Sequence, residues 1–266
     1  MLEKKCTQYD KIKLNIGIEH LAKENGDHAI LCYFDNEMVG ILTWYTDDGI
    51  VANINGMVHP EYRRKGIFSN LLKFAKEDIK KQGIKTLIYR FLKDSESGFR
   101  FVSSLNVEFE RSEYSMTLSN LQNEKRLRYL DLYLSSMEPE DFEFAIKCSS
   151  QAFGHSEEWS REFFSRTDEP SNKTYIVKIE SENVGLIRIN YLSPNTAVIY
   201  SFCIIPSHQG KGIGQDVLRK TVSLLLEEQC TNIRLSVVTN NDRALNLYKK
   251  VGFEVTSEFK YYKGDL

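Results

Sequence analysis

A register of matching residues recurs 146 positions apart along this chain of 266 residues. Residues 58–68 and residues 204–214 share proline, lysine, glycine and isoleucine at this one offset. The offset persists further along, where it pairs Leu105 with Val251. Solenoid repeats are only about 20–45 residues long, so a period of this length indicates a duplicated domain.

The two copies are separated by a polar segment. Residues 119–125 are mostly polar and follow a strand-like segment at 114–118. Upstream, residues 39–41 match residues 184–186 at an offset of 145, so one residue was gained or lost before the 146 register begins. We predict two domains, residues 1–125 and residues 126–266, each of ordinary size.

The composition is that of a globular protein, with 41% hydrophobic residues, 27% charged residues and a net charge of −2. A nucleic-acid-binding protein would carry a basic excess, which this chain lacks. No apolar stretch approaches the roughly 20 residues of a membrane helix, and the N-terminus lacks the apolar run of a signal peptide. The five cysteines form no C-x-x-C pair, so neither a disulfide framework nor a metal site is indicated. We expect a cytoplasmic protein with no nucleic-acid or membrane partner.

Hydrophobic periodicity predicts the elements of each copy. In the second copy, helices are expected at 139–152, 157–165, 212–226 and 244–251, and strands at 131–134, 175–179, 184–190, 197–205, 233–238 and 253–259. The first copy repeats this order from residue 29 to residue 118, with a further helix at 11–23. The fold class is therefore α/β, with two tandem domains whose helices flank a mixed sheet.

A glycine-rich turn lies between a predicted strand and a predicted helix. It reads Gln209-Gly210-Lys211-Gly212-Ile213-Gly214. Such a turn exposes several backbone N–H groups at a helix N-terminus, where the helix dipole favours an anion. The motifs of P-loops and of dinucleotide-binding turns are both absent. The turn is interpreted as a pyrophosphate site, and the alternative is a tight turn without a ligand.

A second candidate element is the helix at 244–251. Asn241 precedes it and suits a helix N-cap. Tyr248 lies one turn beyond Ala244 and so shares its face. A phenol can give a proton to a departing thiolate. The alternative is an amphipathic helix whose tyrosine only packs.

In order and spacing, these elements resemble the GNAT superfamily of acyl-CoA-dependent N-acyltransferases. The quoted residues fit V/I-x-P-x-x-Q/R-x-x-G-x-G/A, followed by N-x-x-A-x-x-x-Y-x-x-x-G-F. The match is close over residues 184–253 and looser over residues 39–109. The resemblance implies two tandem domains, each with a mixed and mostly antiparallel sheet, and it implies acetyl-CoA as co-substrate.

The resemblance also implies roles for individual residues. The backbone of Cys203, Ile204 and Ile205 would bind the pantetheine arm, and Asn241 would contact the cofactor near the thioester. Tyr248 would be the general acid for the CoA thiolate. The N–H groups of the turn would hold the pyrophosphate, and they belong to Gln209, Gly210, Lys211, Gly212, Ile213 and Gly214.

The sequence departs from some family members in one respect. Those members carry a general-base carboxylate on the strand before the proline, whereas residues 197–205 contain no Asp or Glu. Either an ordered water removes the amine proton, or His155 or Glu157 does, because the loop that carries them flanks the acceptor site in the resembling family. Cys203 is interpreted as a packed side chain and not as a nucleophile.

The first copy has lost the chemical groups of the second. Phe68 stands opposite Gly214, Val102 opposite Tyr248, and Ser95 opposite Asn241. We expect Phe68 to obstruct the turn and the first copy to contribute no chemistry. The predicted activity is transfer of an acetyl group to a small-molecule or peptide amine. The alternatives are a non-catalytic acyl-CoA-binding protein and a transferase of a longer acyl group.

Overall fold

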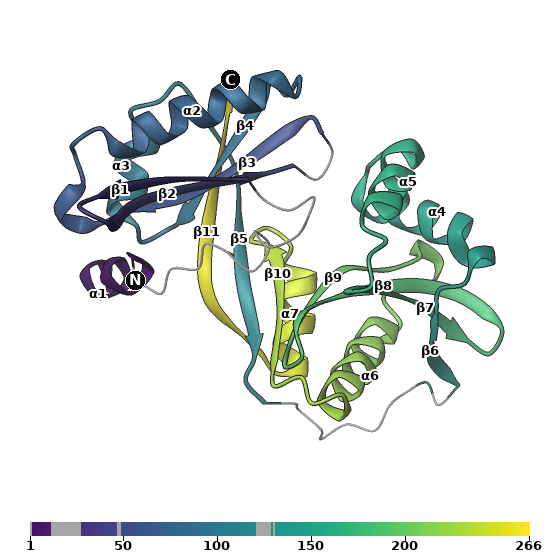
Figure 1. Cartoon of the computed structure of the whole chain (residues 1–266). Helices are drawn as coiled ribbons and strands as arrows, with labels where there is room; N and C mark the ends of the chain where they lie inside the picture. The colour runs from purple at the N-terminus through teal and green to yellow at the C-terminus, as the bar shows by residue number, and fades with distance from the viewer. Residues whose placement is uncertain (1, 12–27, 47–48, 121–128, 130) are drawn as a thin grey trace. The chain divides into compact units, whose positions relative to one another are not determined.

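The computed structural model describes every residue except 1, 12–27, 47–48, 121–128 and 130. The chain folds into two compact units (Figure 1). Unit 1 comprises Met1–Ser112 and Glu258–Leu266, and unit 2 comprises Glu113–Ser257. The helix expected at 11–23 and most of the predicted domain boundary lie outside the described residues.

Unit 1 is built on a mixed sheet with the order β1-β2-β3-β4-β11. Only β3 and β4 run parallel, and the other neighbours are antiparallel. Its strands are β1 (His28–Phe34), β2 (Glu37–Tyr45), β3 (Val51–Val58), β4 (Thr86–Leu92) and the last part of β11 (Phe253–Asp265). Its helices are α1 (Leu2–Asp10), η2 (Pro60–Tyr62), α2 (Ile67–Lys81) and α3 (Glu96–Val102).

Unit 2 is built on a mixed sheet with the order β5-β10-β9-β8-β7-β6. Only β9 and β10 run parallel. Its strands are the last part of β5 (Glu108–Leu118), β6 (Leu132–Ser136), β7 (Asn172–Ile179), β8 (Glu182–Ser193), β9 (Thr196–Ile204) and β10 (Asn232–Val238). Its helices are η3 (Pro139–Asp141), α4 (Phe142–Phe153), α5 (Glu157–Arg166), η4 (Pro206–His208), α6 (Ile213–Glu227) and α7 (Asp242–Val251).

The compact units differ from the two sequence copies in their last strands. Residues 113–117 of β5, which end the first copy, pair with β10 in unit 2. Residues 259–265 of β11, which end the second copy, pair with β4 in unit 1. The predicted limits of 1–125 and 126–266 therefore describe the duplication in the sequence, whereas backbone hydrogen bonding divides the chain differently.

The helix ends follow the local sequence. Gly212 is the N-cap of α6 with a φ of 91°, and Gly66 has the same place at α2 with a φ of 77°. Asn241 is the N-cap of α7 and accepts a hydrogen bond from the Ala244 N–H at 3.1 Å. Gly252 ends α7 with a φ of 115°, a conformation that favours glycine. These boundaries agree with the elements predicted from the sequence.

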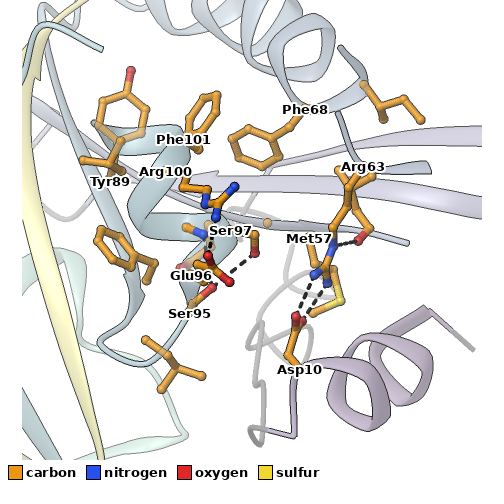
Figure 2. Close-up of a pocket in the computed structure, with 18 of the residues that line it drawn as sticks. Asp10, Met57, Arg63, Phe68, Tyr89, Ser95, Glu96, Ser97, Arg100 and Phe101 are labelled. Atoms are coloured by element: carbon orange, nitrogen blue, oxygen red, sulfur yellow. Dashed lines mark hydrogen bonds and ion pairs between the residues drawn. The ribbon is translucent and has the colours of Figure 1, made fainter. Parts of the chain in front are cut away.

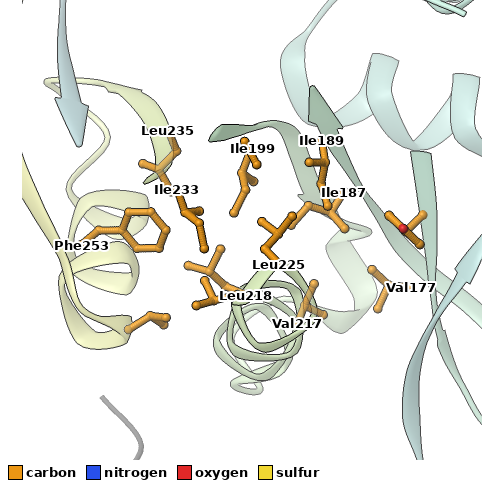
Figure 3. Packing of buried hydrophobic residues seen from close by; sticks show 14 of the residues in the cluster. Val177, Ile187, Ile189, Ile199, Val217, Leu218, Leu225, Ile233, Leu235 and Phe253 are labelled. Carbon is orange, nitrogen blue, oxygen red and sulfur yellow. The ribbon is translucent and has the colours of Figure 1, made fainter. Parts of the chain in front are cut away.

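The main core of unit 2 lies between α6 and one face of its sheet (Figure 3). Val217, Leu218 and Leu225 of α6 are fully buried. They pack in one cluster with Ile187 of β8 and Ile233 of β10. Because Leu218, Val222 and Leu225 recur every three to four residues along α6, a single stripe of the helix faces the sheet.

The other face of this sheet is covered by α4 and α5. Ile146 and Phe164 from these helices pack with Ile176 of β7 and Leu186 of β8. Helices on both faces of a mixed sheet confirm the predicted α/β layers. Among the described residues, no helix is long and apolar enough to cross a membrane.

Candidate functional site

Strand β9 of unit 2 contains a bulge near its end. The β8–β9 register shifts between Leu186 and Arg188, so two residues of β9 stand where one would pair. Ser201, in the bulge, has a φ of 44°. In unit 1, the corresponding β2–β3 pair runs in unbroken register. The bulge contains the one residue by which the repeat offset changes from 145 to 146, and bulges commonly redirect backbone groups beside active sites.

Beyond its first residues, β9 has a free edge. Its parallel pairing with β10 extends only from Thr196 to Ile199, although β9 continues to Ile204. The same holds in unit 1, where β3 pairs with β4 only from Val51 to Ile54. Unpaired N–H and C=O groups on a strand edge can bind an extended ligand as an added strand. The stretch that contains Cys203 and Ile204 has this geometry, except that the Ile204 carbonyl accepts a hydrogen bond from the Gln209 side chain.

The glycine-rich turn follows directly, between η4 and α6. Gly210 has a φ of 79° and Gly212 a φ of 91°. In unit 1, Arg64 has a φ of 63° and Gly66 a φ of 77° at the matching positions. Both units therefore have the same left-handed turn geometry before the helix. Unit 1 keeps this geometry with an arginine, a residue for which a positive φ is costly.

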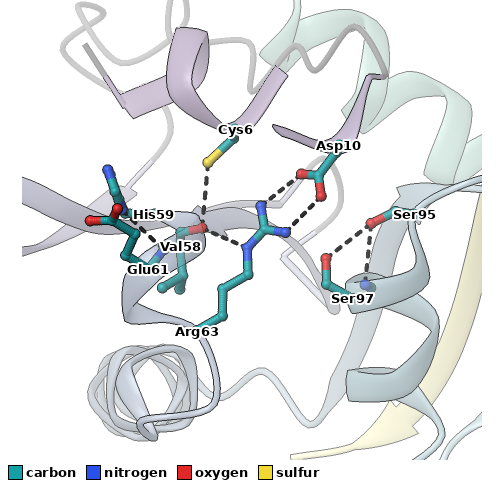
Figure 4. A network of polar contacts seen from close by, with 9 residues as sticks. Cys6, Asp10, Val58, His59, Glu61, Arg63, Ser95 and Ser97 are labelled. Atoms are coloured by element: carbon teal, nitrogen blue, oxygen red, sulfur yellow. Dashed lines mark hydrogen bonds and ion pairs between the residues drawn. The ribbon is translucent and has the colours of Figure 1, made fainter. Parts of the chain in front are cut away.

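Gln209 ties this turn to the strand and to α7. Its Nε2 donates to the Ile204 carbonyl at 2.8 Å, and its Oε1 accepts a hydrogen bond from Arg243 Nη1 at 3.0 Å. In unit 1, Arg63 has the matching place, and its Nε donates to the Val58 carbonyl at 3.0 Å (Figure 4). The side chain at this position holds the strand end in both units.

A different partner completes the contact in unit 1. Both terminal nitrogens of Arg63 donate to the carboxylate of Asp10 on α1, at 2.6 and 2.7 Å. This ion pair raises the pKa of the Arg63 guanidinium. Arg63 is therefore held between α1 and β3.

Two of the predicted turn residues have other local roles. Ile213 is 1% exposed, so its side chain belongs to the core of unit 2. The Lys211 carbonyl accepts a hydrogen bond from the Tyr129 hydroxyl at 3.2 Å. At Ile213 only the backbone is left for an anion, whereas at Lys211 both the backbone N–H and the exposed ammonium remain.

Gly214 is closely packed. A β-carbon at Gly214 would lie 3.1 Å from Leu247 Cδ1 and 3.6 Å from Phe202 Cζ. The missing side chain would therefore point toward β9 and α7. The close approach of α6 to these elements explains the glycine better than does access for an anion.

Unit 1 has the reverse arrangement of glycine and phenylalanine. Phe68 of α2 matches Gly214, and Gly56 of β3 matches Phe202. The Phe68 ring lies over Gly56, where an added β-carbon would be 2.7 Å from Cε2, and it packs edge-on against Phe101 (Figure 2). The Phe68 ring is therefore accommodated over Gly56, and the prediction that it obstructs the turn stays a prediction.

Tyr248 is carried by α7 next to Leu247, which contacts the start of α6. Its ring packs against the core of unit 2, with its centroid 6.3 Å from that of Phe253. Burial raises the pKa of Tyr248 to about 12. The phenol is consequently protonated at every physiological pH and can act as a hydrogen-bond donor.

No Asp or Glu stands in β9, and its tyrosine does not replace one. The Tyr200 hydroxyl donates to Asn172 Oδ1 at 3.1 Å. Burial raises the pKa of Tyr200, so its phenol is a poor base. The other two candidates are exposed: Glu157 begins α5, and the His155 ring stacks on Trp159 at 4.0 Å.

A cavity of about 720 Å³ opens in unit 1 (Figure 2). It lies along the free part of β3, the start of α2 and the helix α3. Its lining includes Asp10, Arg63, Phe68, Tyr89, Arg100 and Phe101. Val102, which matches Tyr248, is 3% exposed and packs in the core of unit 1. Ser95, which matches Asn241, is the N-cap of α3.

Sequence reasoning missed three features of these sites. They are the bulge in β9, the role of Arg243, and the ring exchange that leaves the unit 1 cavity open. The change of offset from 145 to 146 was the available signal for the bulge. The ring exchange was visible only by comparing position 56 with position 202 as well as position 68 with position 214.

Comparison with known proteins agrees with this geometry. The acetyltransferase (GNAT) family model matches the chain twice, over residues 3–95 and residues 134–253. The chain therefore belongs to the GNAT acetyltransferase family. It is 35% identical over 71 residues to a mycothiol acetyltransferase of Corynebacterium jeikeium, a match that spans 27% of this chain and only 21% of that relative.

Two solved structures share the fold of the whole chain. A GCN5-related N-acetyltransferase from Sphaerobacter thermophilus has a TM-score of 0.77 and 16% identity, covering 99% of this chain and 90% of its own. A tandem GNAT protein from the clavulanic acid biosynthesis pathway has a TM-score of 0.69 and 15% identity, covering 99% and 93%. The tandem arrangement of two GNAT domains is thus an established architecture.

Proposed function

We propose that the protein is an acetyl-CoA-dependent N-acetyltransferase and that unit 2 performs the transfer. One observation carries this proposal: β9 has a bulged, free edge that leads into a turn of N–H groups at the start of α6. This order matches the parts of acetyl-CoA, whose extended pantetheine arm joins a thioester to a pyrophosphate. The family membership supports the same class of reaction.

The backbone of unit 2 would bind the cofactor in two places. The backbone of Cys203, Ile204 and Ile205 would pair with the amides of the pantetheine arm along the free edge of β9, although the Ile205 N–H already donates to the Val184 carbonyl at 2.9 Å. The N–H groups of residues 210–214 would hold the pyrophosphate, assisted by the dipole of α6, whereas the Gln209 N–H donates to the Pro206 carbonyl at 3.2 Å. Arg243 lies beside this turn and adds a positive charge.

The transfer would proceed by direct attack in a ternary complex. The nitrogen of a deprotonated primary amine attacks the thioester carbon and forms a tetrahedral intermediate. A backbone N–H of β9, exposed at the bulge, would stabilise the oxyanion. Collapse of the intermediate breaks the carbon–sulfur bond and releases the CoA thiolate. Asn241 would contact the cofactor near the thioester.

Tyr248 would assist the departure of the thiolate. A thiol has a pKa near 8.5, so complete proton transfer from a phenol with a pKa of about 12 is uphill. A hydrogen bond from the neutral phenol to the developing thiolate needs no such transfer. The raised pKa keeps this donor available while the thiolate departs.

The base that receives the amine proton would be an ordered water, His155 or Glu157. The structure leaves all three open, since the two side chains are exposed and β9 contributes no carboxylate. The acceptor would be a small-molecule or peptide amine. An exposed loop would let the acceptor enter from solvent, so we expect the α4–α5 connection to shape the acceptor site.

A second candidate function is acyl-CoA binding without transfer, and the cavity in unit 1 favours it. Unit 1 keeps the turn geometry and the free strand edge, but Val102 replaces the phenol. Unit 1 could thus hold CoA, or a longer acyl-CoA, without reacting. If neither unit transfers acetyl groups, the whole chain would be a sensor of acyl-CoA.

A pair of matched variants tests the proposal. Tyr248→Phe should lower turnover by about 10²-fold, the range for loss of a general acid, with little change in CoA affinity. Val102→Ala changes the matching position in unit 1 and should leave turnover near that of the wild type. Turnover would be followed by release of free CoA from acetyl-CoA with a panel of primary amines. Equal rates for Tyr248→Phe and the wild type would remove Tyr248 from the mechanism.

A further inference from the structure

Two thiols face each other inside unit 2, although they are far apart in the sequence. The Sγ atoms of Cys148 on α4 and Cys203 on β9 lie 3.4 Å apart. Only 3% of Cys148 and 7% of Cys203 is exposed. A disulfide requires about 2.05 Å between its sulfurs, so this is a reduced pair in direct contact.

The surroundings leave the two thiols with few other polar contacts. They lie in an apolar cluster between α4, α5 and the sheet, with Ile176 and Leu186 among its members. Besides each other, the polar groups in reach of Cys203 are the Cys148 carbonyl, 3.9 Å from its Sγ, and the backbone of Leu186. The two thiols are therefore in direct contact within a mostly apolar cluster.

The first copy shows that this fold does not require a pair of thiols here. Met57 of β3 matches Cys203, and it packs beneath α1 with Cys6 and Ile41. Cys6 directs its thiol to the Val58 carbonyl at 3.4 Å, and no second cysteine stands opposite it among the described residues. A thioether fills the strand position in unit 1, so the dithiol is specific to unit 2.

The contact makes the two sulfurs unequal. The hydrogen bond between the two thiols lowers the pKa of Cys148, whereas the same hydrogen bond and burial raise the pKa of Cys203. Since the thiolate is the form that reacts with oxidants, Cys148 is the sulfur that would react first. Cys203 is already in contact with Cys148 and can attack the oxidised Cys148 sulfur.

We propose that Cys148 and Cys203 are a modification site that forms a reversible disulfide with a hydroperoxide as oxidant. The Cys148 thiolate attacks one peroxide oxygen, breaks the O–O bond, and becomes a sulfenic acid while hydrogen peroxide yields water. Cys203 then loses its proton and attacks the Cys148 sulfur, which releases the second oxygen as water. In total, two thiols and one peroxide give one disulfide and two waters, and a dithiol reductant reverses the change.

The disulfide would act on the site in unit 2, an effect that rests on the proposed function. Bond formation brings the sulfurs about 1.4 Å closer, which draws α4 and β9 together. Cys203 directly follows the bulge at residues 201–202. The edge of β9 that does not pair with β8 is the one proposed to bind pantetheine. A displacement of about 1 Å at a reacting centre can cost about 10²-fold in rate. Oxidation would therefore lower turnover reversibly.

The experiment treats the reduced full-length protein with hydrogen peroxide and maps its thiols by alkylation and peptide mass spectrometry. We expect one linked pair of peptides, which contain Cys148 and Cys203, and its loss after dithiothreitol. Cys148→Ala removes one partner and should give no link. Cys32→Ser changes a half-buried thiol of unit 1 and should leave the link unchanged. Binding of coenzyme A and turnover are measured on the same samples before and after reduction.

The outcomes separate the modification from the proposed function. A link between other cysteines, or sulfinic acid at Cys148 without a link, would overturn the disulfide. A linked protein that binds coenzyme A and turns over as the reduced form does would overturn its control of the site. If reduced protein neither binds coenzyme A nor transfers acetyl groups, the proposed function fails, although the disulfide still forms.

Discussion

The exchange of glycine and phenylalanine between the two units predicts a strong coupling between positions 202 and 214. Unit 2 has Phe202 on β9 and Gly214 on α6, whereas unit 1 has Gly56 on β3 and Phe68 on α2. Gly214→Phe alone puts two rings into the space of one. The double variant, Phe202→Gly with Gly214→Phe, reproduces the arrangement of unit 1. It should lower the stability of unit 2 much less than the sum of the two single changes.

The magnitudes follow from the contacts. In Gly214→Phe the new β-carbon starts 3.1 Å from Leu247 and its ring meets Phe202, so overpacking should cost about 1–3 kcal/mol. Phe202→Gly removes a partly buried ring, and about half of the 3–5 kcal/mol for a buried Phe→Ala change is expected. In the double variant the ring from α6 refills the cavity. A coupling energy of about 2–3 kcal/mol should result, at the upper end for residues in contact.

The assay must report on unit 2 alone, because two-unit proteins need not unfold in one step. The chain has two tryptophans, Trp44 in unit 1 and Trp159 in unit 2. In a Trp44→Phe background, the fluorescence of Trp159 follows unit 2 during urea unfolding. The four members of the cycle are the background, the two single variants and the double variant, each also titrated with coenzyme A.

Additivity within about 0.5 kcal/mol would refute the reasoning, because it would mean that the two rings do not compete for one space. A double variant that is stable but fails to bind coenzyme A would refute the expectation that the turn stays accessible beside a ring on α6. It would show that a phenylalanine at the first turn of the helix does obstruct the cofactor, and the cavity in unit 1 would then be closed to CoA.

Five further predictions concern unit 2. Deletion of Ser201 should restore the unbroken register of unit 1, and turnover should fall by about 10²-fold while coenzyme A still binds by calorimetry. Gly212→Val forces a β-branched residue into a φ of 91° and should weaken coenzyme A binding more than tenfold, or about 1.4 kcal/mol. Gly210→Arg copies a residue that unit 1 tolerates, so its affinity should stay within about threefold of the wild type, or about 0.65 kcal/mol. The pKa of Tyr248 is raised to about 12 from about 10 in the unfolded chain, so its contribution to stability is complete below pH 10 and is lost toward pH 12. Urea unfolding at pH 9 and pH 11 should show a larger loss for the wild type than for Tyr248→Phe. Asn241→Ala should cost about 1 kcal/mol of stability through the lost N-cap, and it should also weaken coenzyme A binding if the Asn241 amide contacts the cofactor.

The order of elements could be predicted from the sequence because periodicity and capping are local properties. Gly212, Asn241 and Gly252 mark helix ends in the sequence, and the structure has those ends. Strand pairing is not local in this sense. The alternation of apolar and polar residues shows which face a strand buries but not which strand it pairs with. The pairing of β5 with β10 and of β11 with β4 could therefore not be predicted from the sequence.

The same limit applies to the site. The sequence placed the turn at residues 209–214 correctly between a strand and a helix, since glycine, proline and the apolar run are read directly. The obstruction expected from Phe68 judged one position without its neighbour across the core, Gly56, and it stays a prediction that coenzyme A binding would test. A ring that looks misplaced in a list of matched residues is accommodated when the facing residue is glycine.

The two units share the same backbone arrangement at this site and differ at a few positions. Both keep the left-handed turn, the free strand edge and a side chain that donates to the strand-end carbonyl. These are the features that bind an extended ligand with a terminal anion, and they require mainly backbone geometry. Unit 2 alone adds the bulge and Tyr248, which under the proposed function would act on charge that develops only during transfer. On that proposal, a duplicated domain would lose the ability to react by losing one bulge residue and one phenol, while the backbone geometry proposed to bind the cofactor is kept.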